Sequence, residues 1–161
     1  MSNIKESVLK EIGLDRWPPF IEDKRFWVAL LAGVVTCLIL LLTVVPTFSV
    51  QDRSISGLLL MTVIYYPVLE EILFRGVIQG WFIKRDWGAR KYLHISAANW
   101  ITSGLFVIAH FYYQPVLWSV LLLAPSLVFG FFRDHYRSIY PSIGLHVFYN
   151  AGFMFINIVA Q

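Results

Sequence analysis

The feature that most constrains this chain is an apolar run over 26–45 that contains no charged side chain. A helix needs about 20 such residues to cross the hydrocarbon core of a bilayer. Hydrophobic residues make up 58% of the chain, charged residues only 14%, and the mean hydropathy is +0.65. Because so few charges cannot cover the surface of a soluble domain, we expect lipid to cover much of this one.

Similar apolar segments recur along the chain, separated by short polar stretches. They lie at 26–45, 57–83, 95–113, 116–132 and 139–159. This pattern predicts an all-α fold, a polytopic transmembrane bundle of about five spanning helices. We expect a single membrane-embedded domain over 1–161, without internal repeats.

Residues 1–25 form an arm ahead of the first apolar segment. Apolar side chains recur at helical spacing over 1–17, as at Ile4 and Val8, and charged side chains lie between them. This pattern predicts an amphipathic helix that lies on the membrane surface and ends before Pro18. A tail without regular structure is the alternative.

The basic residues of the loops predict the orientation. Eleven Lys and Arg residues lie in the arm and in the loops at 84–94 and 133–138, whereas the loops on the other side contain only Arg53. Basic loops face the cytoplasm, so we place the N-terminus inside and the C-terminus outside. The net charge of +3 reflects these loops and predicts no nucleic-acid partner.

Ionisable side chains interrupt three of the apolar segments. They are Glu70, Glu71 and Arg75 in the second segment, His110 in the third and His146 in the fifth. Each costs roughly 2.5 to 3.5 kcal/mol to insert, so such residues usually face a bundle interior and serve a function. Glu71 and Arg75 are four residues apart and can pair on one helix face. Glu70 lies about 100° around the helix and is free to face another partner.

The remaining polar residues share faces and depths. His146 and Asn150 lie four residues apart on one face of the fifth segment, as Phe106 and His110 do on the third. At about 1.5 Å per residue, Glu70 and His110 lie roughly 20 Å and 22 Å from the cytoplasmic ends of their helices. Asn150 and His146 lie roughly 16 Å and 10 Å from the cytoplasmic end of theirs.

These groups suit hydrolysis by an activated water. A buried carboxylate beside an imidazole can deprotonate a water. An amide and an imidazole on one face can donate hydrogen bonds to a developing oxyanion. Together they are the parts of a peptide hydrolase, although a buried polar cluster that only locks helix packing is the alternative.

Three short motifs resemble those of one family. Residues 70–75 resemble the EExxxR motif of the CPBP (CAAX protease and bacteriocin-processing, or Abi) intramembrane proteases. Residues 106–110 resemble their FxxxH motif and residues 146–150 their HxxxN motif. The resemblance covers 57–150, the motif-bearing core.

The resemblance implies a glutamic-type intramembrane endopeptidase that cuts a peptide bond in or near a membrane segment of a partner protein. It implies that Glu70 is the general base, assisted by His110, and that His146 and Asn150 stabilise the oxyanion. The supporting residues are Glu71, Arg75 and Phe106, of which Phe106 is expected to pack. The substrate would be a protein or peptide with a membrane-associated tail, and the location a prokaryotic inner membrane.

Two other functions stay open. A metal-dependent protease would use Glu and His ligands for zinc or another divalent ion, although the HExxH signature is absent. A non-catalytic membrane immunity or partner protein, or a proton-coupled transporter, could also carry intramembrane Glu and His. We expect no cofactor, and the lone Cys37 excludes a metal site built on thiolates.

Overall fold

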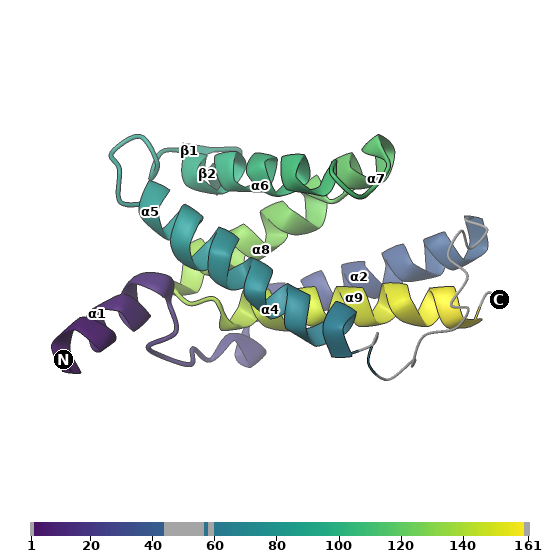
Figure 1. Cartoon of the computed structure of the whole chain (residues 1–161), viewed down its shortest axis with the longest axis horizontal. Coiled ribbons are helices and arrows are strands. Elements are labelled where there is room, and N and C mark those ends of the chain that lie inside the picture. Colours follow the sequence, from purple (N-terminus) through teal and green to yellow (C-terminus); the bar gives the residue numbers. More distant parts are fainter. Residues whose placement is uncertain (1, 44–56, 58–59, 160–161) are drawn as a thin grey trace. The chain divides into compact units, whose positions relative to one another are not determined.

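The computed structural model describes the chain except for residues 1, 44–56, 58–59 and 160–161. Helices dominate these residues, and the only strands among them form one short hairpin (Figure 1). The chain divides into two compact units. The first contains Met1–Pro18 and Glu70–Ile143, and the second contains Pro19–Leu69 and Gly144–Gln161.

The first unit carries most of the polar residues of the core. Its helices and strands are α1 (Ser2–Ile12), η3 (Glu71–Gln79), α5 (Gly80–Phe82), β1 (Lys91–Tyr92), β2 (Ile95–Ser96), α6 (Ala97–His110), α7 (Val116–Leu121) and α8 (Leu123–Tyr136). Helix η3 is wound as a π-helix. This form is rare in proteins overall, but the π-helices that occur are often found at functional sites. Helices α6, α8 and η3 pack against one another and enclose the polar core of this unit.

The N-terminal helix is shorter than the sequence predicts. Helix α1 ends at Ile12, six positions before Pro18, because Gly13 adopts a left-handed conformation with φ of +85°. A side chain at Gly13 would meet the Arg137 carbonyl oxygen at 3.0 Å. The end of α1 packs on η3, where Ile12 lies against Gly76, while Ile4 stays 72% exposed.

The loop predicted at 84–94 contains an unexpected hairpin. Strands β1 and β2 pair antiparallel, so the third predicted segment does not begin as a helix at 95. The Ser96 Oγ accepts a hydrogen bond of 3.0 Å from the Asn99 backbone N–H and thereby caps α6, which begins at Ala97. Leu93 and His94 form the turn with φ of 52° and 66°.

A correction also applies to the loop predicted at 133–138. Helix α8 continues to Tyr136 and stops at Arg137, which has a left-handed φ of 52°. The charged residues stay helical because Arg133 is buried and bonded. Its Nε donates to the Arg75 carbonyl at 3.1 Å and its Nη2 to the Glu11 carbonyl at 3.0 Å.

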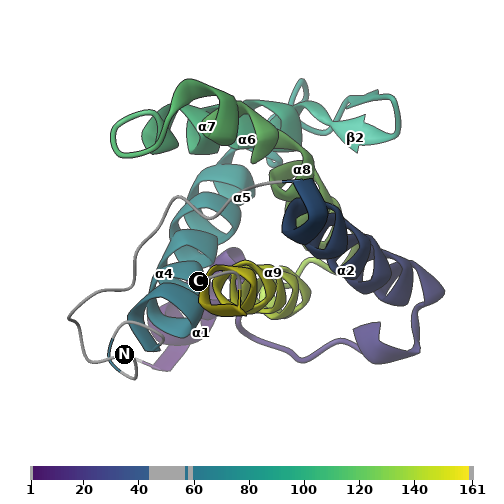
Figure 2. The same cartoon turned by 90° about the vertical axis from the view of Figure 1, so that its right-hand side faces the viewer.

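The second unit is built around two long helices. Its elements are η1 (Phe20–Glu22), α2 (Lys24–Thr43), η2 (Leu60–Tyr65), most of α4 (Tyr66–Glu70) and most of α9 (Tyr140–Val159). Helices α2 and α9 lie side by side (Figure 2). The Tyr149 hydroxyl donates to the Ala29 carbonyl at 2.7 Å, and Gly33 makes room for the Tyr149 ring.

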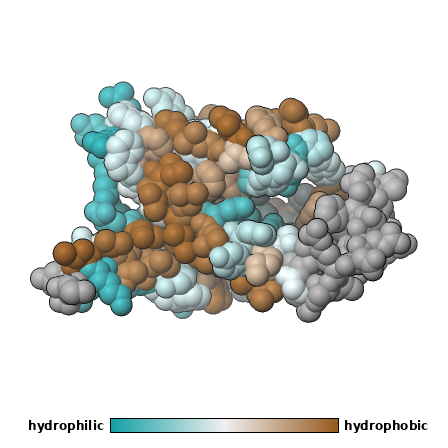
Figure 3. Space-filling model, viewed as in Figure 1, coloured by the Kyte–Doolittle hydropathy of each residue, from teal (hydrophilic) through white to brown (hydrophobic). Residues whose placement is uncertain are grey.

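Two helical stretches among the described residues are long and apolar enough to cross a membrane. They are Lys24–Thr43, which is α2, and Val116–Tyr136, which joins α7 to α8. Apolar side chains cover much of the face shown in Figure 3. The other three predicted spans stay predictions, and the predicted connection at 46–56 lies outside the described residues.

Candidate active site

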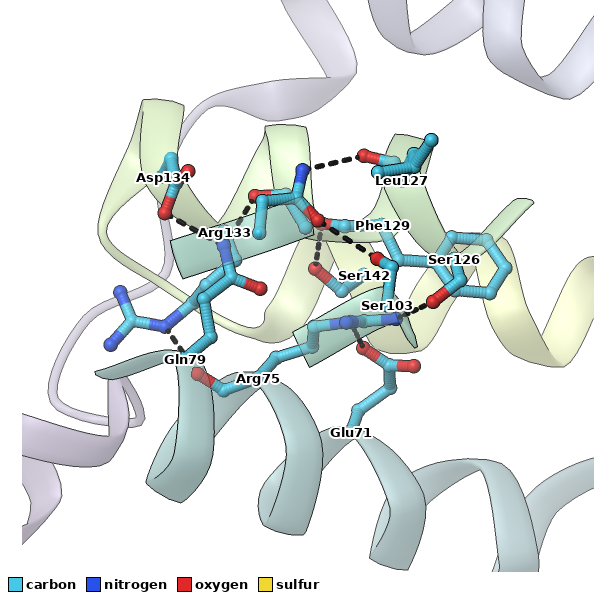
Figure 4. Close-up of polar contacts among 12 residues, drawn as sticks. Glu71, Arg75, Gln79, Ser103, Ser126, Leu127, Phe129, Arg133, Asp134 and Ser142 are labelled. Atoms are coloured by element: carbon cyan, nitrogen blue, oxygen red, sulfur yellow. Dashed lines mark hydrogen bonds and ion pairs between the residues drawn. The ribbon is translucent and has the colours of Figure 1, made fainter. Parts of the chain in front are cut away.

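The site begins with three polar side chains that follow one face of η3. Glu71, Arg75 and Gln79 recur every fourth residue, and all three are fully buried (Figure 4). The Arg75 Nε lies 3.3 Å from the Glu71 Oε2, so the pairing predicted from their spacing is confirmed. Glu70, at the junction of α4 and η3, is only half-buried and therefore faces different surroundings.

Helix α8 supplies the partners of this face. Ser126, Gly130 and Asp134 also recur every fourth residue. The Arg75 Nη2 donates to the Ser126 Oγ at 2.7 Å. The Gln79 Nε2 donates to the Gly130 carbonyl at 2.9 Å and to the Asp134 Oδ1 at 2.7 Å. The two helices are thus joined by a ladder of hydrogen bonds with a spacing of one turn (Figure 4).

Helix α6 closes the polar core from the third side. The Asn99 Nδ2 donates to the Leu127 carbonyl at 2.9 Å, and Ser103 donates to the Asn99 Oδ1 at 3.0 Å. The Ser96 hydroxyl donates to the Asp134 Oδ2. A Cβ at Gly130 would lie 2.0 Å from the Asn99 Oδ1, so only glycine permits this approach.

Gln79 and Asp134 belong to this core, although the sequence predictions did not include them. Two signals could have found them. Gln79 continues the four-residue spacing of Glu71 and Arg75, and Asp134 continues that of Ser126 and Gly130. Such spacing places a whole series of polar groups on one helix face.

Aromatic rings connect the Arg75 ion pair to His110. The Arg75 guanidinium lies over the Phe106 ring, 5.6 Å from its centroid, and Phe74 packs against that ring at 5.0 Å. The Phe106 ring in turn lies 4.3 Å from the His110 ring. Phe106 is buried and packs between Phe74 and His110, in agreement with the expectation that it packs.

The backbone determines which nitrogen of His110 carries a proton. The His110 Nδ1 lies 2.8 Å from the Phe106 carbonyl oxygen, which can only accept a hydrogen bond. Nδ1 must therefore carry the proton and donate it. In the neutral ring the Nε2 is then an acceptor, able to bind a water hydrogen or take a proton.

Tyr113 interacts with both Glu70 and His110. The Glu70 carboxylate interacts electrostatically with the Tyr113 phenol and with Arg75. The Tyr113 ring lies 5.1 Å from the His110 ring. The first unit thus contains both members of the predicted catalytic pair, and each of them interacts with Tyr113.

His146 and Asn150 belong to the second unit. His146 is buried, with 6% of its surface exposed, and Asn150 is half-buried. The Asn150 Nδ2 donates to the Thr62 carbonyl of η2 at 3.0 Å. An amide nitrogen carries two hydrogens, so this bond orients the side chain and leaves a second donor.

A metal site needs several ligand side chains close together. Among the residues that the structure describes, no three His, Cys, Asp or Glu side chains cluster closely enough to hold an ion. The Glu71 carboxylate forms the buried ion pair with Arg75, which competes with any metal for it.

The long apolar helices expose many of their side chains, which is typical of a helical membrane protein. Ionisable side chains, among them a carboxylate and an imidazole, lie within this apolar chain and define a candidate site. The model of the Rce1-like type II CAAX prenyl endopeptidases matches residues 52–152. The chain belongs to this family and is therefore a membrane protease, which confirms the resemblance seen in the motifs. The match includes all three motifs, whereas α1 and α2 lie outside it. Comparisons with curated proteins and with solved structures give no match.

Proposed function

We propose that this protein is a glutamic-type intramembrane endopeptidase that needs no metal. The observation that carries the proposal is the bond from the His110 Nδ1 to the Phe106 carbonyl. The charge of Glu70 acts on Tyr113, whose ring lies 5.1 Å from the His110 ring. The bond from Nδ1 makes the Nε2 an acceptor, so a water can donate one hydrogen to the Glu70 carboxylate and the other to this nitrogen. When both hydrogens of the water are bonded to these acceptors, a lone pair of its oxygen can point at the carbonyl carbon of the substrate.

The proposed reaction follows from these roles. The water donates one hydrogen to the Glu70 carboxylate and the other to the His110 Nε2. As its oxygen bonds to the substrate carbonyl carbon, Glu70 takes a proton and the carbonyl oxygen becomes an oxyanion. Glu70 then gives this proton to the amide nitrogen, the C–N bond breaks, and a carboxylic acid and an amine leave.

His146 and Asn150 stabilise the oxyanion in this proposal. One ring N–H of His146 and the second Nδ2 hydrogen of Asn150 are the donors. The bond from Asn150 to the Thr62 carbonyl supports this role, because it holds the amide in one orientation. Fixed donors stabilise developing charge better than mobile ones, since they do not reorganise during the reaction.

The proposed setting is a prokaryotic inner membrane, with a single domain and five spanning helices. The N-terminus is cytoplasmic and the C-terminus outside, as the basic loops indicate. Helix α1 lies on the membrane surface and buries Ile4 and Val8 in it, which agrees with their exposed fractions of 72% and 46%. The substrate is a protein whose membrane-associated tail reaches Glu70.

A comparison of membrane proteomes tests the proposal. Membranes from cells with the wild-type protein are compared with those from cells carrying Glu70→Gln, and protein termini are sequenced by mass spectrometry. We expect at least one membrane tail to accumulate uncleaved in the variant. The control is Glu22→Gln, the same change at an exposed position of η1, which should match the wild type. If all termini are the same in the three samples, the proposal is wrong.

A further inference from the structure

Three buried polar atoms of the first unit stand out from the hydrogen-bonded core around them. They are the Gln79 Oε1, the Thr102 Oγ1 and the Arg75 Nη1, and no atom of the described residues forms a hydrogen bond with any of them. The side chains of all three residues are fully buried. Burying a polar atom without a partner costs its whole desolvation free energy, so native proteins seldom leave such atoms unmatched.

The contacts place these atoms in one region. The Arg75 guanidinium lies over the Phe106 ring, which sets the register of η3 against α6. Gln79 is one turn further along η3. It bonds to Gly130, which in turn lies against Asn99 near the beginning of α6.

The two helices therefore run antiparallel. One turn along η3 from Arg75 corresponds to one turn back along α6 from Phe106, which is the position of Thr102. Gln79 and Thr102 thus lie at the same level.

Water is the ligand that suits this set of atoms. Arg75 supplies a donor, Gln79 an acceptor, and the Thr102 hydroxyl can do both. A water molecule has two donors and two acceptors and typically makes about three bonds in a buried site. A cation would be repelled by Arg75. An anion would be repelled by the Glu71 carboxylate and by the Gln79 oxygen.

We propose that the layer between Gln79 and Thr102 binds ordered water, and that this water supplies the reaction at Glu70. The second part rests on the proposed function, because each cleavage consumes one water in an apolar medium. The Arg75 guanidinium links the two places. It lies over the ring of Phe106, one turn from His110, and its charge interacts with Glu70.

The variant that tests this proposal is Thr102→Val, which replaces the hydroxyl by a methyl group of similar size. In a dry core the change would remove an unmatched buried hydroxyl and raise the melting temperature. In a core that holds water it would remove a partner of that water, so the melting temperature stays the same or falls. The matched control is Thr36→Val on α2, where the hydroxyl is exposed and bonds to the Ala32 carbonyl at 2.8 Å.

Measuring kcat and KM distinguishes a role of Thr102 in supplying water to the reaction from a role in packing alone. We expect Thr102→Val to lower kcat roughly two- to tenfold, the change that corresponds to one hydrogen bond, with KM unchanged. Thr36→Val should leave kcat as in the wild type. A high-resolution map should also show a water within about 3.2 Å of both the Thr102 Oγ1 and the Gln79 Oε1.

Each outcome decides one part of the proposal. A higher melting temperature for Thr102→Val, or a map without that water, overturns the water site. An unchanged kcat for Thr102→Val overturns the proposal that this water supplies the reaction at Glu70. If the wild-type protein cleaves nothing, the proposed function fails, whereas the melting temperature and the map still decide whether the core holds water.

Discussion

The buried ion pair between Glu71 and Arg75 allows a quantitative prediction from the structure. Both side chains are fully buried and their charged atoms lie 3.3 Å apart. At an effective dielectric constant of about 20, two unit charges at this distance attract each other by about 5 kcal/mol. Removing one charge also leaves the other buried without compensation, which costs about 3 to 5 kcal/mol in measured cases.

We therefore expect Glu71→Gln to lower the free energy of unfolding by about 3 kcal/mol, the lower end of this range. The lower end applies because the amide oxygen of Gln can still accept a hydrogen bond from Arg75. The control is Glu11→Gln, which breaks the ion pair with Lys84. That pair is shorter, at 2.8 Å, but both side chains are more than half exposed, so the change should cost less than about 1 kcal/mol.

Unfolding in mixed micelles of SDS and a mild detergent measures both values. A third variant, Glu71→Gln with Arg75→Met, removes both charges and should be more stable than Glu71→Gln alone. A cost for Glu71→Gln no larger than that for Glu11→Gln would refute the view that burial, and not distance, determines the strength of these pairs.

Four further predictions follow from the packing of α6 and from the proposed chemistry. Gly130→Ala should lower the free energy of unfolding by about 1 to 3 kcal/mol, because its Cβ would lie 2.0 Å from the Asn99 Oδ1. Gly104→Ala, with nothing within 4 Å, should instead raise it by about 0.5 to 1 kcal/mol in the same assay. Phe106→Leu should lower kcat up to roughly tenfold, because His110 loses an aromatic contact; steady-state kinetics that match the wild type would count against this. Cleavage should survive a chelator such as EDTA, and activity that disappears with EDTA and returns with zinc would favour a metalloprotease.

The sequence predicts several parts of the fold because their causes are local. The predicted span at 26–45 corresponds to α2, which begins at Lys24 and is described to Thr43. The ion pair of Glu71 and Arg75 follows from helical spacing alone. The helix predicted over 1–17 was too long because Gly13, whose left-handed conformation ends the helix, carries no local signal as strong as that of two prolines.

Other features depend on contacts that a local pattern does not contain. Charged residues at 133–136 resemble a loop, but Arg133 finds the carbonyls of Arg75 and Glu11, far away in the chain, and the helix continues. The turn at Leu93 and His94 lacks the glycine or asparagine that usually marks a tight hairpin. Asp134 belongs to the polar core only because Gln79 and Ser96 lie beside it.

The most direct test of the proposed chemistry compares two neighbouring carboxylates. Glu70→Gln and Glu71→Gln are the same change at adjacent positions, measured on the purified protein in liposomes with a tail identified from the proteome comparison. We predict that Glu70→Gln lowers kcat by roughly 10² to 10⁴ while its melting temperature stays at the wild-type value. Cleavage by Glu70→Gln at the wild-type rate would contradict the assignment of Glu70 as the general base.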